Sequence, residues 1–434
     1  MAKPALLGGK PITKNLLLKS NLKFRPDLER KYLLETHKSG YWDNWPGLNT
    51  MAARFAREWK TFNKSAFCIL LTNGTHSLQL ALEALEIGYG DEVIVPGLTW
   101  QATASAVCDV NAVPVLVDID ENTLCIDPAL IENAITPRTK AIIPVHLYHR
   151  MADMDAIRKI AKKHKLHIIE DCAHVHGSLW RGKAPGTMGD FGTYSFQKSK
   201  LMNSGEGGAL LMQNEELYEK AESLRVCGRS VNGKTKINGK NFKTKSFELN
   251  GGTRMHSGNF RLTSFQAAVL RGQLSALRKN APRIDRNGIA LDRAISDAPG
   301  VQPLKRSPHI TRQCGYGFAF LYDSNYYDGL DAAIFREALS AELGVTFGTT
   351  YTPLSHSEVY YPHTKKRHQL SKSYLKSINP ARFSLPVADD IWKNKAVVSL
   401  WQIFNCPPGR AGLLTDAIAR IYENRKALLK KQRK

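Results

Sequence analysis

Asp171 and Lys200 are the two residues of this sequence whose types and surroundings best suit chemistry. Asp171 follows a short, largely apolar run at 166–170, and Lys200 lies in a polar turn at 195–200. Ligands of open α/β sheets bind at the carboxyl ends of the strands. The spacing therefore allows both side chains to face one cleft.

The carboxylate of Asp171 needs a cationic partner in such a cleft. A protonated pyridine nitrogen would serve, because the carboxylate raises the pKa of that nitrogen and keeps the ring positive. A positive ring can absorb the electrons of a substrate carbanion. On this residue alone, an N-cap for a following helix is an equally good interpretation.

The amine of Lys200 is a nucleophile only when it is neutral. Burial beside a cationic ring would lower its pKa towards that state. A plain surface lysine is the alternative, and Lys198 is a competing candidate two residues earlier.

The residues at 73–77 could hold the anionic end of a ligand. They lie between an apolar strand and a helix, so their backbone N–H groups and the Thr75 hydroxyl could bind a phosphate at the helix N-terminus, with Ser195 adding a second hydroxyl. The same residues suit an ordinary N-cap, and they match an Asn-x-Thr glycosylation pattern. Trp100, after another strand, could stack on a planar ring, although a core tryptophan is the simpler interpretation.

A string of possible metal ligands also lies in this part of the chain. Cys172, His174 and His176 alternate along an extended segment, which does not gather a tetrahedral set of ligands. We therefore expect no metal site.

Alternation of short apolar runs with amphipathic helical stretches predicts an α/β fold with a mostly parallel sheet. The predicted strands are 67–72, 92–96, 113–118, 140–145, 166–170, 193–196 and 208–212. Two helices at 264–277 and 283–298 indicate a domain boundary near Asn280, giving a large domain at 1–280 and a smaller α+β domain at 281–434. Aromatic residues of the smaller domain could line a pocket or lie on a surface loop; these are Tyr351, His356, Tyr360 and Tyr361.

The composition narrows the class of protein without specifying a function. A formal charge of +22 favours anionic ligands or nonspecific contact with nucleic acid. Much of the excess lies at 229–245 and 425–434, which we interpret as solvated or mobile segments. The seven cysteines include no CxxC pair, and no signal peptide or apolar run of membrane-spanning length is visible, so we expect a cytoplasmic protein without a membrane segment.

Taken in order, these motifs resemble the DegT/DnrJ/StrS family of sugar aminotransferases. The resemblance rests on 73–75, Trp100, 170–174, 195–200 and 205–208, and it extends from about 6–11 to 258–261 and 266–268. Within the family, 96–100, 146–148 and 151–155 are most similar to glutamine-dependent scyllo-inosose aminotransferases and to 3-amino-5-hydroxybenzoate synthase.

The resemblance implies a fold-type-I transferase that binds pyridoxal 5′-phosphate. It implies that Lys200 carries the cofactor as a Schiff base, and Lys200 also argues against related dehydratases, which have histidine at this position. The other implied roles are Asp171 as pyridinium partner, Gly74, Thr75 and Ser195 as phosphate ligands, Trp100 as the stacking ring, His174 against the phenolic oxygen, and Asn259 reaching the phosphate of a partner subunit in a homodimer.

The implied reaction moves an amino group from an amino acid, L-glutamine by resemblance, to a keto-cyclitol or keto-sugar by a ping-pong mechanism. One alternative is an aromatising reaction like that of 3-amino-5-hydroxybenzoate synthase. Another is a non-catalytic protein that binds nucleic acid through its basic tail, although no nucleic-acid recognition module is visible.

Overall fold

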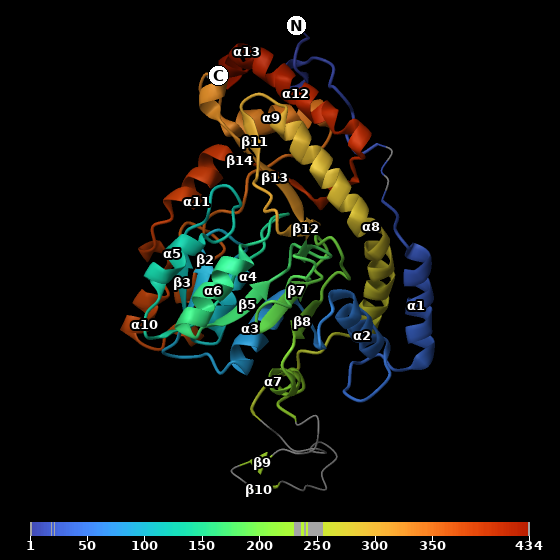
Figure 1. Cartoon of the computed structure of the whole chain (residues 1–434), viewed down its shortest axis with the longest axis vertical. Coiled ribbons are helices and arrows are strands. Elements are labelled where there is room, and N and C mark those ends of the chain that lie inside the picture. The colour runs from blue at the N-terminus through green and yellow to red at the C-terminus, as the bar shows by residue number, and fades with distance from the viewer. Residues whose placement is uncertain are drawn as a thin grey trace.

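The core of the protein is a seven-stranded sheet, described here from a computed structural model of residues 2–18, 20, 22–229, 236–237, 240–241 and 255–432. The strand order is β1-β8-β7-β5-β4-β2-β3, and Figure 1 shows this sheet in the lower half of the molecule. Its strands are β1 (Phe67–Leu71), β2 (Glu92–Pro96), β3 (Val113–Val117), β4 (Thr139–Ile142), β5 (His167–Asp171), β7 (Phe191–Ser195) and β8 (Gly208–Met212). β8 runs antiparallel to its neighbours β1 and β7, and the other pairings in this sheet are parallel. The predicted α/β fold is confirmed.

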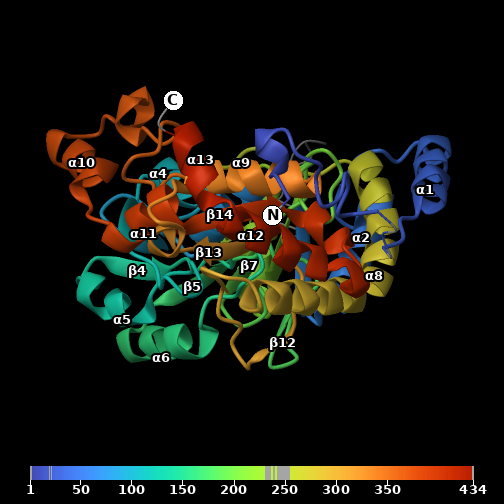
Figure 2. The ribbon, with the colours of Figure 1, turned by 90° about the horizontal axis from the view of Figure 1, so that it is seen from above.

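Helices cover both faces of this sheet. In Figure 2 the strands β4 and β5 lie between α4 on one side and α6 on the other. Burial of one stripe of each helix, such as Met154, Ile157 and Ala161 of α6, joins the layers. The helices of this part are α1 (Pro26–Ser39), α2 (Met51–Asn63), α3 (Gly74–Ala84), α4 (Ala102–Asp109), α5 (Pro128–Ile131), α6 (Met154–His164) and α7 (Glu215–Arg225).

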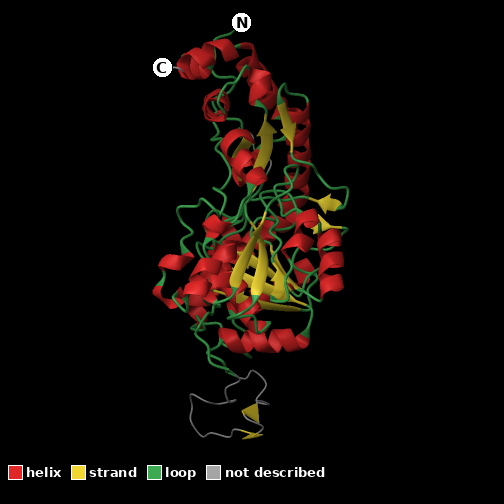
Figure 3. Ribbon diagram, turned by 90° about the vertical axis from the view of Figure 1, so that its left-hand side faces the viewer, coloured by secondary structure: helices red, strands yellow, loops and turns green. Residues whose placement is uncertain are grey.

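A smaller antiparallel sheet with the order β11-β13-β14 lies above the large one along the long axis of the molecule (Figure 3). Its strands are β11 (Val301–Pro303), β13 (Gly317–Tyr322) and β14 (Ala396–Leu400). Two separate two-stranded sheets pair β6 (Leu179–Trp180) with β12 (Ile310–Arg312) and β9 (Lys236–Ile237) with β10 (Lys240–Asn241). The helices of the C-terminal part of the chain are α9 (Ala332–Leu343), α10 (Lys372–Ser377), α11 (Pro386–Asp390), α12 (Gly412–Glu423) and α13 (Arg425–Gln432). Of these, α10 lies beside β3 of the large sheet (Figure 1).

One long helix, α8 (Ser264–Ser296), replaces the two helices expected at 264–277 and 283–298. Pro282 lies inside it, but Ala281 and Ile284 on either side are buried, and the side chain of Asn280 bonds to the backbone of Lys23. Packing therefore maintains the helix through a residue that normally ends one. The proposed domain boundary near Asn280 falls within α8, which contacts both α1 and β11.

The basic C-terminal segment is not a loose tail as far as residue 432. Residues 425–432 form α13, where Leu428 is fully buried and Arg425 pairs with Asp328 at 2.9 Å. One apolar side chain and this ion pair attach the segment to the body, while Lys426 and Lys430 are exposed, as the solvated interpretation expects. Most of the other basic stretch, 229–245, lies outside the described residues.

No helix in the described part of the chain combines the length and apolar character that crossing a membrane requires. The seven cysteine thiols are free. The expected reducing compartment remains a prediction.

Candidate active site

Asp171 is the last residue of β5 and is 7% exposed. Its Oδ2 accepts a hydrogen bond of 3.0 Å from the Thr103 hydroxyl, and its Oδ1 accepts one of 3.2 Å from the N–H of Ala173. Burial raises the pKa of the Asp171 carboxyl, while these two bonds and the nearby Lys200 amine act in the opposite direction. Turns and the short strand β6 follow Asp171, so the N-cap interpretation is wrong.

Lys200 lies in the loop after β7 and is 9% exposed. Its Nζ lies 4.2 Å from the centre of the Tyr316 ring. Burial lowers the pKa of the Lys200 amine to about 8, and attraction by Asp171 partly opposes this change. Lys198 is exposed and lies outside the cavity wall, so the structure separates the two lysines.

The start of α3 forms the anion-binding end of the site. Asn73 caps the helix by accepting a bond from the N–H of His76, whereas Gly74 and Thr75 belong to the first turn, whose N–H groups have no acceptor within the helix. A Cβ atom at Gly74 would lie 2.8 Å from the Cβ of Ser195. Glycine thus allows the helix start and the Ser195 hydroxyl to approach the same point.

Aromatic rings form the opposite wall. The His174 ring stacks on the Tyr316 ring at 4.2 Å and 22°, and the Trp100 ring meets Tyr351 at 5.8 Å and 54°. Trp100 is 48% exposed, so its indole face is available to a ligand. Burial and the charge of Lys200 hold the pKa of His174 well below its usual value, so that its imidazole is neutral.

These residues enclose a cavity of about 530 Å³. Its wall includes seven of the eight predicted site residues, which are Gly74, Thr75, Trp100, Asp171, His174, Ser195 and Lys200. Asn259 is the exception: it lies in a β-bridge with Val226, and its side chain accepts a bond from the N–H of Arg261. Its role across a subunit interface remains a prediction.

The arrangement fits pyridoxal phosphate. In the described chain the buried Asp171 carboxylate accepts bonds only from the neutral donors Thr103 and Ala173, so it remains free to balance a pyridinium. The open first turn of α3 suits a phosphate, and a buried amine of lowered pKa suits bond formation with an aldehyde.

The cavity also contains residues that sequence reasoning missed or left undecided. Tyr316 and Thr103 were missed, although the glycines on both sides of Tyr316 mark a close approach of backbones. Tyr351 lines this cavity, and two adjoining cavities are lined by His356 and by Tyr360 with Tyr361.

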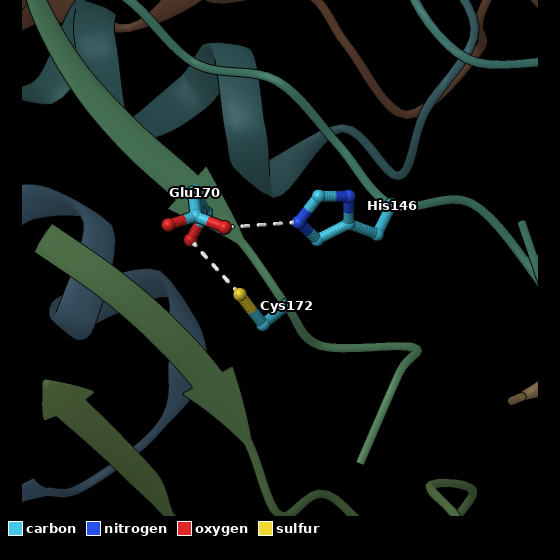
Figure 4. A group of neighbouring side chains, drawn as sticks. All are labelled: His146, Glu170 and Cys172. Carbon is cyan, nitrogen blue, oxygen red and sulfur yellow. Dashed lines mark hydrogen bonds and ion pairs between the residues drawn. The ribbon is translucent and has the colours of Figure 1, made fainter. Parts of the chain in front are cut away.

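His146, Glu170 and Cys172 form the one group among the described residues whose ligand-type atoms lie within 4.8 Å of one another (Figure 4). Glu170 accepts bonds from the backbone N–H groups at 186, 188 and 189 and from His146 Nε2, while Nδ1 of His146 accepts a bond from the N–H of Ala152. These lone pairs are already used, so the cluster acts as a buried hydrogen-bond network.

The possible metal ligands Cys172, His174 and His176, which alternate in the sequence, do not point to one common position. Nδ1 of His174 accepts a bond from the N–H of Tyr148, Nδ1 of His176 accepts one from the N–H of Met202, and the Cys172 thiol donates to the Glu170 carbonyl. The three side chains therefore serve three separate parts of the structure.

Residues 26–399 match the profile of the DegT/DnrJ/EryC1/StrS aminotransferase family. The chain is 42% identical over 355 residues to an L-glutamine:2-deoxy-scyllo-inosose aminotransferase of Streptoalloteichus tenebrarius, covering 81% of this chain and 82% of the relative. It is 39% identical over 363 residues to an enzyme of the same name from Streptomyces paromomycinus, covering 83% and 84%. Among solved structures, 3-amino-5-hydroxybenzoic acid synthase aligns with a TM-score of 0.75 at 28% identity over 95% of this chain and 99% of that one. The chain therefore belongs to the DegT/DnrJ/EryC1/StrS family, whose members are aminotransferases that depend on pyridoxal phosphate.

Proposed function

We propose that this aminotransferase moves the amino group of L-glutamine to the ketone of a cyclitol, with 2-deoxy-scyllo-inosose as the first candidate. The observation that carries the chemistry is the buried pair of Lys200 amine and Asp171 carboxylate in one cavity with the open start of α3. The names of the two relatives, which align over four fifths of the chain, support this donor and acceptor.

The site residues divide the work of holding the cofactor. Bound pyridoxal phosphate would supply an electrophilic carbon and a ring that withdraws electrons from a substrate carbanion. Asp171 would keep the pyridine nitrogen protonated, and the Thr103 hydroxyl bonds to the carboxylate and favours its ionised form. The N–H groups of Gly74 and Thr75 would hold the phosphate together with the Ser195 hydroxyl.

Lys200 has two roles in this proposal. Its neutral Nζ would hold the cofactor through the cofactor's aldehyde carbon. When a donor amino acid occupies the site, the same Nζ would be the base that takes the proton from the α-carbon of the donor. The ketone passes through the same steps in reverse, so the donor product leaves before the acceptor binds and the kinetics are ping-pong.

The test of this function separates the two half-reactions. Glutamine alone should abolish the absorbance of the lysine-bound cofactor, and later addition of 2-deoxy-scyllo-inosose should restore it. Lys200→Ala should abolish turnover, whereas the matched control Lys198→Ala should retain it. Normal activity in Lys200→Ala, or a borohydride-trapped adduct on Lys198, would contradict the assignment.

An aromatising reaction is the second candidate, because a 3-amino-5-hydroxybenzoic acid synthase shares the fold over 95% of this chain. The product mass decides between the two. An aminated cyclitol from a ketocyclitol plus glutamine supports amino transfer, and an aromatic amine from a dehydroshikimate-type substrate supports the second candidate.

We also propose a homodimer in which Asn259 completes the phosphate site of the partner subunit. The position of Asn259 outside the cavity of its own chain supports this arrangement. Lys200→Ala and Asn259→Ala subunits, each inactive alone, should regain part of the activity when they are unfolded and refolded together. No recovery in mixed dimers would refute the shared site.

A further inference from the structure

Tyr148 occupies an unusual backbone conformation beside the active site. It follows β4, is 2% exposed, and has a φ of 54° in the left-handed region. A bulky residue rarely adopts this conformation, and it persists only where the surrounding structure over-determines it. The contacts of Tyr148 with its neighbours must therefore stabilise this conformation.

Three polar groups of Tyr148 contact three different residues of the cavity wall. Its N–H donates to Nδ1 of His174 at 3.1 Å, its carbonyl accepts from the N–H of Tyr316 at 2.9 Å, and its phenol accepts from the N–H of Tyr351 at 3.2 Å. The phenol also bonds to the Thr350 hydroxyl at 2.8 Å. Tyr148 itself does not line the cavity.

These contacts join elements that are distant in the sequence. His174 follows β5 of the large sheet, whereas Tyr316 precedes β13 of the small sheet and Tyr351 follows α9. A Cβ atom at Gly315 would lie 2.8 Å from the Tyr148 carbonyl oxygen, so glycine permits this close approach. Two residues after Tyr148, the fully buried Arg150 pairs with Asp292 of α8 at 2.9 Å and holds this loop against that helix.

The bond from the Tyr148 N–H also selects the proton position on His174. Nδ1 must carry a lone pair to accept this bond, so a neutral imidazole has its proton on Nε2. Nε2 lies 3.4 Å from the Tyr351 hydroxyl, on the side of the cavity. The ring therefore directs an N–H donor towards the Tyr351 hydroxyl in the cavity wall.

We propose that Tyr148 is a positioning residue that fixes His174 as the Nε2–H tautomer and sets Tyr316 and Tyr351 as the wall against which the ketone acceptor binds. This inference rests on the proposed function for the identity of the acceptor. The backbone N–H of Tyr148 fixes the tautomer of His174, and its carbonyl fixes the position of Tyr316. Its phenol fixes the position of Tyr351. Removing the phenol hydroxyl therefore affects the position of Tyr351 and leaves the other two contacts in place.

The test uses the holoenzyme with Tyr148→Phe and the matched control Tyr322→Phe. Tyr322 is also buried and loses one phenol hydrogen bond, to the Leu330 carbonyl at 2.8 Å, but it lies outside the cavity wall. Tyr148→Phe removes the phenol bonds to the Thr350 hydroxyl and to the Tyr351 N–H, and only the second holds a residue of the cavity wall. Loss of that second bond predicts an increase of about fivefold in KM for 2-deoxy-scyllo-inosose. The rate of the glutamine half-reaction should change by less than about twofold in both variants.

A second measurement tests the backbone part of the proposal. In protein labelled with ¹⁵N-histidine, the His174 signals, assigned with a His174→Gln variant, should show a bare Nδ1 and a protonated Nε2 in the wild type and in Tyr148→Phe. A proton on Nδ1, or equal KM changes in the Phe variants of Tyr148 and Tyr322, would overturn the proposal. If the wild type does not use this ketone, the proposed acceptor is wrong, and the ¹⁵N signals alone decide the inference.

Discussion

The ionisation of Lys200 yields the most direct quantitative prediction. Burial lowers the pKa of this amine from the ordinary value of 10.5 to about 8. At pH 7.5 the neutral fraction would be about 0.1% at the ordinary pKa and about a quarter at the lowered one, a gain of about two hundredfold. The rate of bond formation with an aldehyde should therefore rise with pH and level off above about pH 8.

Asp171→Asn perturbs this ionisation in a defined direction. The carboxylate attracts the ammonium and raises its pKa, so its removal should move the midpoint of the pH curve to lower pH. The variant should bond to pyridoxal phosphate at lower pH than the wild type does. It should nevertheless lose amino transfer, because nothing then keeps the pyridine nitrogen protonated.

The assay is the initial rate at which cofactor-free enzyme bonds to added pyridoxal phosphate, followed by borohydride trapping and mass analysis of the Lys200 peptide across a pH series. A wild-type midpoint near the ordinary lysine value would refute the role of burial. A midpoint that rises in Asp171→Asn would refute the assigned electrostatic coupling.

Three further substitutions test the surroundings of this pair. Thr103→Val removes a hydrogen bond to the Asp171 carboxylate worth about 1.5–3 kcal/mol, so the pKa of Asp171 should rise. The acid limb of the pH profile of kcat/KM should then move to higher pH. An acid limb at the wild-type pH would contradict this role of Thr103. Gly74→Ala places a Cβ atom 2.8 Å from the Cβ of Ser195, so the Kd for pyridoxal phosphate in equilibrium dialysis should rise at least about tenfold. The circular dichroism spectrum should not change. An unchanged Kd would refute phosphate binding at the start of α3. Glu170→Gln disrupts a fully hydrogen-bonded buried carboxylate, at a cost of about 3 kcal/mol, and should lower the melting temperature by several degrees. Zinc or a chelator should leave the melting temperature of the wild type unchanged, and stabilisation by zinc would show a metal site instead.

The strands that carry the site could be predicted because buried parallel strands are short apolar runs between breakers. The bounds of β2 and β8 agree with the predicted 92–96 and 208–212. The strand predicted at 140–145 ends at Ile142 instead, before Pro144, which has no N–H for the ladder. The break predicted in α8 was wrong because local propensity at Asn280 and Pro282 is outweighed by burial of their neighbours.

The sequence by itself determined which residues lie at the ends of the strands. The order of strands and turns brings these residues to one edge of the sheet, and they include Asp171, Ser195, Lys200 and the start of α3. Only the tertiary structure decided which lysine is buried and which aromatic rings close the cavity. Tyr316 and Tyr351 come from segments more than a hundred residues after Lys200, and no local pattern reports such contacts. Their places depend on their hydrogen bonds to Tyr148 and on the strained backbone of that residue, both of which exist only in the folded chain.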